Sequence, residues 1–304
     1  MTPTEWSLLL LLSLLWGGSF FFVGVAVKAL PPFTIVAARV ATAAALLWLA
    51  APFSGLSPAR LLAAAPQLLV LALINNVAPF SLLTWSQTHL ASGLASILNA
   101  TTPVSTVFFA HIFTRDEKLN ASRLFGALIA FSGVAVMIGP DLRDLGDDLA
   151  AELAALLATL FYAAASVFAR RFRRLGLAPI DVATGQVTAS SLVLVPLALL
   201  VDAPWRLPAP GLAPIAALLA IGALSTALAF VVYFRLIAGA GAVNAVLVTV
   251  LAPAFAILLG AMALGERLAP PHFAGLALIA FGLAVIDGRL PRAALARLAP
   301  SGAR

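Results

Sequence analysis

Two adjacent amides, Asn75 and Asn76, lie in an otherwise apolar stretch of the chain just before Pro79. Amide side chains donate and accept hydrogen bonds without carrying charge, which suits them to orient an uncharged or zwitterionic solute in an apolar cavity. Pro79 lacks the backbone N–H that a helix needs, so we expect the helix to loosen beside the amides. The amides could instead bridge neighbouring helices, and the sequence leaves both roles open.

Aromatic side chains provide the apolar part of such a cavity. Trp16 and Phe20 are one helical turn apart and project from one face, while Tyr162 occupies a similar depth in the second half of the chain. We expect these three to contact a solute; packing or lipid contact is the alternative. Trp85 and Tyr233 lie near predicted ends of apolar segments, where interfacial aromatic belts are expected.

Arg39 lies about two turns inside an apolar segment, so its guanidinium must be paired, reach the membrane surface or contact a solute. A structural role is the favoured interpretation, in which Arg39 bonds loop carbonyls or an acid such as Asp141. Binding of a solute stays open for Arg39, and Lys28 and Gln186 are weaker candidates for the same neighbourhood.

Amides and prolines recur together in both halves of the chain. Asn99 precedes Pro103, and Asn244 precedes Pro253. We expect Asn99 to bind solute, and Pro79, Pro103 and Pro253 to act as hinges when one half moves against the other. Static kinks satisfied by nearby hydroxyl groups are the alternative for these prolines.

Groups for covalent or metal chemistry are missing from the sequence at membrane depth. All twelve Asp and Glu residues map to loops or segment ends, the chain has no cysteine, and its three histidines have no paired metal-ligand spacing. An intramembrane enzyme would need a nucleophile with a base, paired acids or metal ligands at depth. The sequence therefore predicts no catalytic residue, no metal site and no cofactor, and it argues against polycationic cargo and proton antiport through a buried acid.

The elements that must position these residues are membrane-spanning helices. Of the 304 residues, 62% are hydrophobic and 10% are charged, and the mean hydropathy is +1.08, which is too apolar for one water-soluble core. A span needs about 20 apolar residues. Charge, Pro and Gly divide the chain into ten candidates, 7–27, 33–52, 62–84, 91–113, 121–139, 150–170, 180–201, 212–235, 242–264 and 272–288. The sequence thus predicts an all-α protein of ten transmembrane helices.

The placement of basic residues predicts the orientation. Cytoplasmic loops carry an excess of Lys and Arg, and the loops on the side of the N-terminus hold Arg60, Arg115, Lys118, Arg123, Arg170, Arg171, Arg173, Arg174, Arg235, Arg289, Arg292, Arg297 and Arg304. The opposite side holds only Lys28, Arg143, Arg206 and Arg267. Both termini are therefore predicted to be cytoplasmic, and the net charge of +6 indicates membrane topology and not a nucleic-acid partner.

The end of each half repeats. Residues 124–136 resemble residues 273–285, and Gly126 and Gly133 match Gly275 and Gly282. These glycines predict close helix packing, or alternatively a contact between two copies of the chain. Glu117 and Glu266 also match, and at loop positions we expect them to cap or tether helices.

Five spans per half is an odd number, so the second copy must enter the membrane from the opposite side. Inverted halves with a midplane site between them are a recurring transporter architecture. We predict a first five-helix repeat at 1–140, an outward-facing acidic linker at 141–149, an inverted repeat at 150–288 and a basic cytoplasmic tail at 289–304.

The sequence resembles the EamA branch of the drug/metabolite transporter superfamily, ten-helix carriers made of two five-helix repeats. The resemblance rests on Leu15-Trp16-Gly17-Gly18-Ser19-Phe20, on Ala37-Ala38-Arg39 and on the twice-repeated block of Pro, Glu-(Lys/Arg)-Leu, Gly and Phe. Within that family the chain looks most like the exporters of amino acids, including aromatic ones. The second half departs from the pattern, because Tyr162-Ala163-Ala164-Ala165-Ser166 replaces the Trp-Gly-Gly-Ser motif and Gln186 replaces Arg39.

These features together predict an alternating-access carrier in the inner membrane that exports neutral or zwitterionic amphipathic solutes, with amino acids as the expected cargo. An exporter of other small metabolites or drugs is the alternative. A channel or a receptor is not favoured, because the sequence has no filter loop and no sizeable signalling domain. The expected partners are the small-molecule substrate and the bilayer, and the chain is expected to act as a monomer or homodimer.

Overall fold

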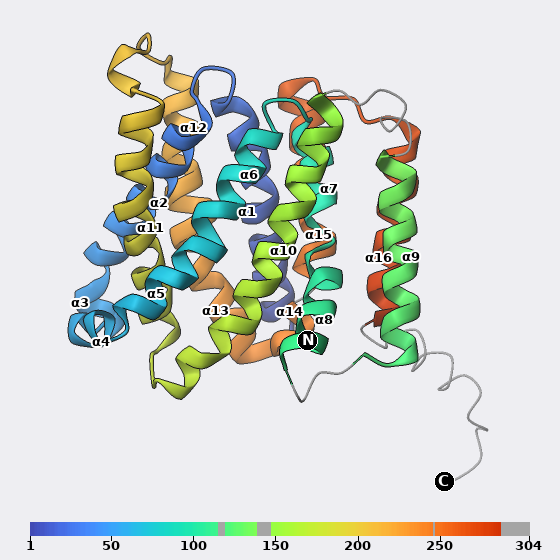
Figure 1. Cartoon of the computed structure of the whole chain (residues 1–304), viewed down its shortest axis with the longest axis horizontal. Coiled ribbons are helices and arrows are strands. Elements are labelled where there is room, and N and C mark those ends of the chain that lie inside the picture. Colours follow the sequence, from blue (N-terminus) through green and yellow to red (C-terminus); the bar gives the residue numbers. More distant parts are fainter. Residues whose placement is uncertain (115–118, 139–146, 246, 287–304) are drawn as a thin grey trace.

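A computed structural model of the chain describes residues 1–114, 119–138, 147–245 and 247–286, and every regular element in this part is helical (Figure 1). The first half contains α1 (Pro3–Ala26), α2 (Pro32–Leu49), α3 (Ala51–Ser54), α4 (Pro58–Ala63), α5 (Ala65–Ala72), α6 (Ala78–Ser86), α7 (Ser92–Asn99), α8 (Thr102–Phe113) and α9 (Ala121–Ile138). The second half contains α10 (Asp147–Arg174), α11 (Pro179–Val201), α12 (Leu212–Gly222), α13 (Ala229–Ala240), α14 (Ala242–Ala245), α15 (Val248–Leu259) and α16 (Pro270–Ile286).

Seven of the described helices are long and apolar enough to cross a membrane, and three further apolar helices are shorter. The seven long ones include α5 to α6 and α12 to α13 as continuous helices, and the three shorter ones are Ala121–Met137, Val248–Leu264 and Pro270–Ile286. The predicted segments agree with these helices to within a few residues. The predicted break after the third segment is confirmed, because the helix ends at Ser86 and the next begins at Ser92.

Local sequence explains several of the helix ends. Proline is the first residue of α1, α2, α4, α11 and α16, where its missing N–H costs nothing and its fixed φ suits a helix. Thr2 and Glu5 form a capping box at the start of α1. Gly265, with φ of 69°, ends the last turn before the Glu266 loop in the left-handed conformation that glycine adopts without strain.

Matching helices of the two halves lie antiparallel. The backbone N and the hydroxyl of Thr34, near the start of α2, donate to Asp202 Oδ2 at the end of α11, at 2.6 and 2.8 Å. At the opposite end of α11, Ser57 N, at the start of α4, donates to Asp181 Oδ1 at 3.1 Å, and Arg60 of α4 forms a 3.2 Å ion pair with Asp181. Helix α11 is therefore tied to α2 at one end and to α4 at the other.

The glycine-rich helices α9 and α16 form a second antiparallel pair, side by side at one edge of the bundle (Figure 1). A Cβ at Gly126 would lie 2.5 Å from the carbonyl oxygen of Gly282, and one at Gly133 would lie 2.7 Å from that of Gly275. The close packing predicted from the glycine spacing is thus confirmed. The alternative, in which this face joins two copies of the chain, is wrong because the face is already occupied within one chain.

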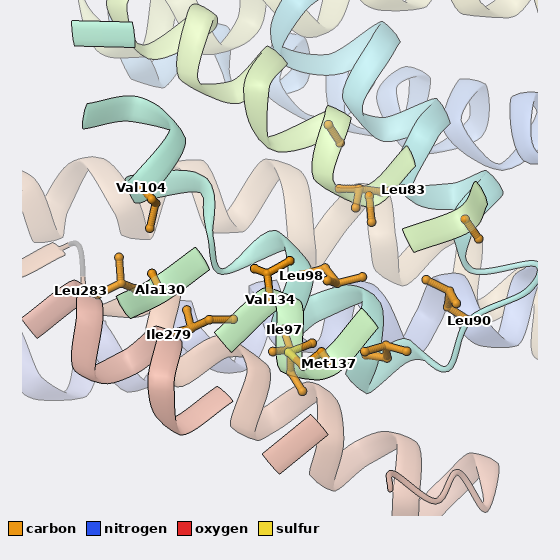
Figure 2. Close-up of a cluster of buried hydrophobic side chains, with 14 of the residues drawn as sticks. Leu83, Leu90, Ile97, Leu98, Val104, Ala130, Val134, Met137, Ile279 and Leu283 are labelled. Carbon is orange, nitrogen blue, oxygen red and sulfur yellow. The ribbon is translucent and has the colours of Figure 1, made fainter. Parts of the chain in front are cut away.

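A hydrophobic cluster fastens this pair to the rest of the bundle. Ile97 of α7, Met137 of α9 and Ile279 of α16 are at most 1% exposed and belong to one cluster, which also takes in residues of α6, α8 and α10. Figure 2 shows these side chains gathered between the ribbons. Lipid tails are as apolar as these side chains, so van der Waals packing, and not removal of apolar surface from water, stabilises this cluster.

Of the three π-helical turns in the described residues, two lie at matching places in the halves, and the third, Gly260–Leu264, follows α15. Leu73–Val77 separates α5 from α6, and Ala223–Leu228 separates α12 from α13. The loosening predicted beside Pro79 therefore takes the form of a π turn, which widens the helix and redirects the side chains that it carries. The second π turn has alanine at the matching place, Ala229, so proline is not required for this geometry.

Candidate functional site

A cavity of about 440 Å³ lies between the two halves of the chain. Residues of α1, α2, α7, α8, α10, α11 and α15 line it, as do residues of the segments that contain the π turns Leu73–Val77 and Ala223–Leu228. Its size is within the range of small-molecule sites in proteins, about 300–1,000 Å³. All of the residues predicted to bind solute are part of its lining: Trp16, Phe20, Arg39, Asn75, Asn76, Asn99, Tyr162 and Gln186.

The first π turn places both of its amides against α11. Asn75 Nδ2 donates to Gln186 Oε1 and Asn76 Nδ2 donates to Ser190 Oγ, each at 2.9 Å. The predicted bridging of helices therefore occurs. It uses only one end of Asn76, because the buried Oδ1 atom has no hydrogen-bond partner among the described residues. That oxygen is an unsatisfied acceptor beside the cavity, but it is fully buried, so neighbouring side chains must shift before a solute can reach it.

The second π turn makes the corresponding contact with α2. Thr226 is the fourth residue of its π turn, as Asn76 is of the first, and its hydroxyl accepts a 3.0 Å hydrogen bond from Arg39 Nε. Arg39 aligns with Gln186 in the sequence repeat. Each half thus extends a π turn to the second long helix of the other half, once through neutral amides and once through a guanidinium.

Arg39 is held on two sides. Besides the bond to Thr226, its guanidinium carbon lies 3.8 Å from the centroid of the Phe80 ring, a cation–π contact. The expected bond to a loop carbonyl is replaced by this hydroxyl bond, and the suggested acid, Asp141, lies outside the described residues. Lys28 is exposed and is not part of the lining, so the weaker prediction that it shares this neighbourhood is wrong.

Aromatic rings surround the cavity in two groups. Trp16 lies 5.4 Å from Tyr233 between ring centroids, and Phe80 lies 6.4 Å from Tyr162. Tyr233 was expected in an interfacial belt, and that expectation is wrong because the side chain packs on Trp16 and lines the cavity. Trp85, by contrast, is 38% exposed and outside the lining.

Sequence reasoning missed several lining residues of the second half. Phe230, Tyr233 and Phe234 follow the second π turn on α13 and line the cavity, as do Ser225 and Thr226 within the turn. The sequence held a usable signal, because Phe230 falls at the place in the repeat that Phe80 holds in the first half. Carrying the repeat through the third segment would have found it.

Further polar atoms in the lining are buried without a hydrogen-bond partner in the described part of the chain. They are Gln87 Oε1, Ser96 Oγ, Asn99 Oδ1 and Ser225 Oγ. Buried polar atoms in proteins are nearly always satisfied, so these unpartnered atoms make the lining of this cavity a candidate site for a polar ligand. Amide oxygens accept hydrogen bonds, and hydroxyl groups both accept and donate them.

The described lining of the cavity carries positive charge and no negative charge. Among the described residues around the cavity, Arg39 is the only charged one, and none is Asp or Glu. Asp181, Asp202 and Glu266 are instead engaged at the ends of helices. The described residues also contain no cluster of His, Cys, Asp and Glu that could hold a metal ion.

The three predicted hinge prolines lie at different distances from the cavity. Pro253 is inside α15 and lines the cavity, Pro103 is the second residue of α8 just after the break from α7, and Pro79 is the second residue of α6; neither of the latter two is part of the lining. Next to Pro253, a methyl group at Gly17 would overlap the carbonyl oxygen of Ala252. Helices α1 and α15 thus touch backbone to backbone beside the cavity.

Glu266 joins two elements at one end of the bundle. Its carboxylate accepts hydrogen bonds from Ser92 N at 3.0 Å, from Ser92 Oγ at 2.8 Å and from Gly93 N at 3.3 Å, at the start of α7. The predicted tethering role is confirmed for Glu266. Its counterpart Glu117 lies outside the described residues.

Comparison with known proteins agrees with the two-repeat arrangement. The profile of the EamA-like transporter family matches residues 5–139 and again residues 149–287. The chain is 24% identical over 71% of its length to the uncharacterized transporter YoaV of Bacillus subtilis (strain 168), covering 73% of that protein. It is 27% identical to a probable terminal-alkyne amino-acid exporter of Streptantibioticus cattleyicolor, over 68% of each chain.

A solved structure, described only as the crystal structure of a protein, has the same fold. It superposes with a TM-score of 0.65 at 21% sequence identity, over 94% of this chain and 98% of the other. The likeness thus extends over nearly the whole bundle, including the helices that line the cavity.

Proposed function

The chain belongs to the EamA-like transporter family, and from this premise we propose that it is a secondary transporter that works by alternating access. The proposed cargo is small neutral or zwitterionic amphipathic metabolites, amino acids including aromatic ones, and the proposed direction is export across the inner membrane. The similarity to a protein named a probable terminal-alkyne amino-acid exporter supports both the cargo and the direction.

The cavity between the halves is the observation that carries this proposal. A solute in it would contact both repeats at once, which is what a carrier needs if movement of one repeat against the other is to expose the solute on alternate sides. Aromatic rings, amides and hydroxyl groups form most of the lining, and these suit an amphipathic solute with a few hydrogen-bonding groups.

The proposed topology is ten spans with both termini in the cytoplasm and the second repeat inverted relative to the first. The antiparallel pairs α2 with α11 and α9 with α16 support inversion, because equivalent helices of inverted repeats run in opposite directions. In Figure 1 the first helix of each half, α1 and α10, also runs in opposite directions.

Movement between the two states would break and remake contacts between the halves. The tethers Thr34–Asp202 and Ser92–Glu266 lie at one end of the bundle, and Ser57–Asp181 lies at the other. We propose that these alternate in closing the two ends, while α1 slides on α15 near Pro253.

Counterflow in proteoliposomes tests the proposal. Vesicles loaded with unlabelled phenylalanine should accumulate labelled phenylalanine, and a panel of neutral and zwitterionic solutes should compete. Trp16→Ala should reduce this exchange, whereas Trp205→Ala, an exposed tryptophan outside the cavity, should not. Failure of every neutral and zwitterionic solute to exchange would overturn the proposed cargo.

A further inference from the structure

We propose that Arg39 binds the carboxylate of the transported solute, so that the carrier requires an amphipathic carboxylate and treats the amino group as dispensable. The inference rests on the proposed function and specifies which part of the cargo is recognised. It assigns to Arg39 a role as the specificity-determining residue of the cavity.

The guanidinium is oriented and only partly used. Its Nε atom donates to Thr226 Oγ1 at 3.0 Å, and its plane lies over the ring of Phe80. The two terminal amino groups make no hydrogen bond to any residue in the described part of the chain. A guanidinium with fixed orientation and free terminal N–H groups matches the two oxygens of a carboxylate, which it can bind through parallel hydrogen bonds.

The charge of the cavity calls for an anionic group. Arg39 is the only charged residue in the described lining, and a charge inside a membrane protein is costly unless it is paired. A carboxylate on the solute would supply the missing partner. A cationic solute would instead face the guanidinium without any described acid to offset the repulsion.

The amino group would find weaker partners. The unsatisfied acceptors of the lining are neutral, such as the Oδ1 atoms of Asn76 and Asn99, and each is buried without a described partner. Asn76 lies about one turn before Phe80 on the same segment, so a solute with its carboxylate on Arg39 has an acceptor nearby. Hydrogen bonds that involve a charged partner on both sides are stronger than those with one neutral partner, so the carboxylate should dominate recognition.

The two halves differ at this point in a way that orients the solute. Gln186 holds the place of Arg39 in the second half, but it is neutral and its Oε1 already accepts a hydrogen bond from Asn75. The positive charge therefore lies only on the α2 side of the cavity. The carboxylate is expected on that side, with the apolar part of the solute among the aromatic rings of Trp16, Tyr162 and Tyr233.

Four matched solutes test the carboxylate requirement on the unmodified protein. Phenylalanine has both groups, 3-phenylpropionate lacks the amino group, phenylalaninamide lacks the carboxylate charge, and phenethylamine lacks the carboxylate altogether. In phenylalanine counterflow, we expect 3-phenylpropionate to compete within a few fold of phenylalanine itself, and the other two to need at least about tenfold higher concentrations. Equal competition by phenylalaninamide would overturn the inference while leaving transport established.

Variants then locate the requirement. Arg39→Gln should remove the preference for carboxylates, Arg39→Lys should retain part of it because a point charge remains, and Arg206→Gln, at an exposed arginine away from the cavity, should leave it intact. Binding measured in detergent by quenching of tryptophan fluorescence gives the same comparison without transport. If Arg39→Gln binds phenylalanine with unchanged preference over phenylalaninamide, Arg39 is not the anchor. If no solute of the panel exchanges in the unmodified protein, the proposed function itself fails.

Discussion

Arg39 in the first half of the chain donates a 3.0 Å hydrogen bond to Thr226 in the π turn of the second half. The reciprocal contact runs from Asn75 in the π turn of the first half to Gln186 in the second. Both contacts cross the interface between the halves, and all four residues line the same cavity. The cavity is thus built where two repeated elements meet, and its two sides differ because the repeat has diverged at Arg39 and Gln186.

Variants of the hydrogen-bonded pair Asn76 and Ser190 distinguish a role in solute binding from a role in helix packing. Asn76→Ala removes both the bond to Ser190 and the free Oδ1 acceptor, whereas Ser190→Ala removes only the bond. Each change should destabilise the folded protein by about 1 kcal/mol. Only Asn76→Ala should also weaken phenylalanine binding, by about fivefold, as measured by fluorescence titration. Equal losses of binding in both variants would assign Asn76 to the scaffold.

Neighbouring glycines provide a matched test of the contact between α1 and α15. A methyl group at Gly17 overlaps the backbone oxygen of Ala252, while one at Gly18 meets only side-chain atoms at 3.7 and 3.8 Å. Gly17→Ala should therefore destabilise the protein by about 1–3 kcal/mol and slow transport, and Gly18→Ala should do neither. Thermal unfolding in detergent and counterflow measure the two effects. Similar stability of both variants would contradict the close approach.

The packing of α9 against α16 should also require glycine at the points of close contact. Gly126→Ala places a methyl group 2.5 Å from Gly282 O and 2.8 Å from Ile286 N, neither of which can rotate away. We expect a loss of about 1–3 kcal/mol. Gly211→Ala is the control, because nothing lies within 4 Å of its Cβ position. A normal melting temperature for Gly126→Ala would show that the pair is not packed as described.

The Glu266 tether is expected to stabilise the start of α7. Glu266→Gln keeps the length of the side chain but removes the negative charge that three donors share, so the melting temperature should fall, by an amount that corresponds to about 1 kcal/mol. Ser92→Ala removes only one of the three bonds and should have a smaller effect. A larger effect of Ser92→Ala would place the stabilisation in the hydroxyl group and not in the charge.

The helices could be predicted from the sequence because the length of each apolar stretch and the prolines that flank it determine where a span begins and ends. The predicted segment 212–235 ends too early, since α13 continues to Ala240. Arg235 suggested an end there, but it lies exposed on the same helix. A charged residue at a membrane surface does not require the helix to end.

The site was predictable where the sequence carries an unusual residue in an apolar stretch. Asn75, Asn76 and Arg39 are conspicuous because polar groups inside a membrane are energetically costly and usually have a functional or structural role. Phe230 and Phe234 were missed because aromatic residues are common in such helices, and Tyr233 was misplaced because its depth was judged from an apparent segment end. Pro79 indicated a loosened helix at the first π turn, but the second π turn could not be predicted, since Ala229 stands where the first half has this proline.

Accessibility of the cavity from both sides of the membrane tests the central claim most directly. The natural chain has no cysteine, so Ser96→Cys or Ser225→Cys introduces a single thiol in the cavity lining. A membrane-impermeant maleimide should label either thiol when applied from each side in turn, and phenylalanine should slow the labelling from both sides. Labelling from one side only, or labelling unaffected by any transported solute, would contradict a carrier that exposes this cavity alternately.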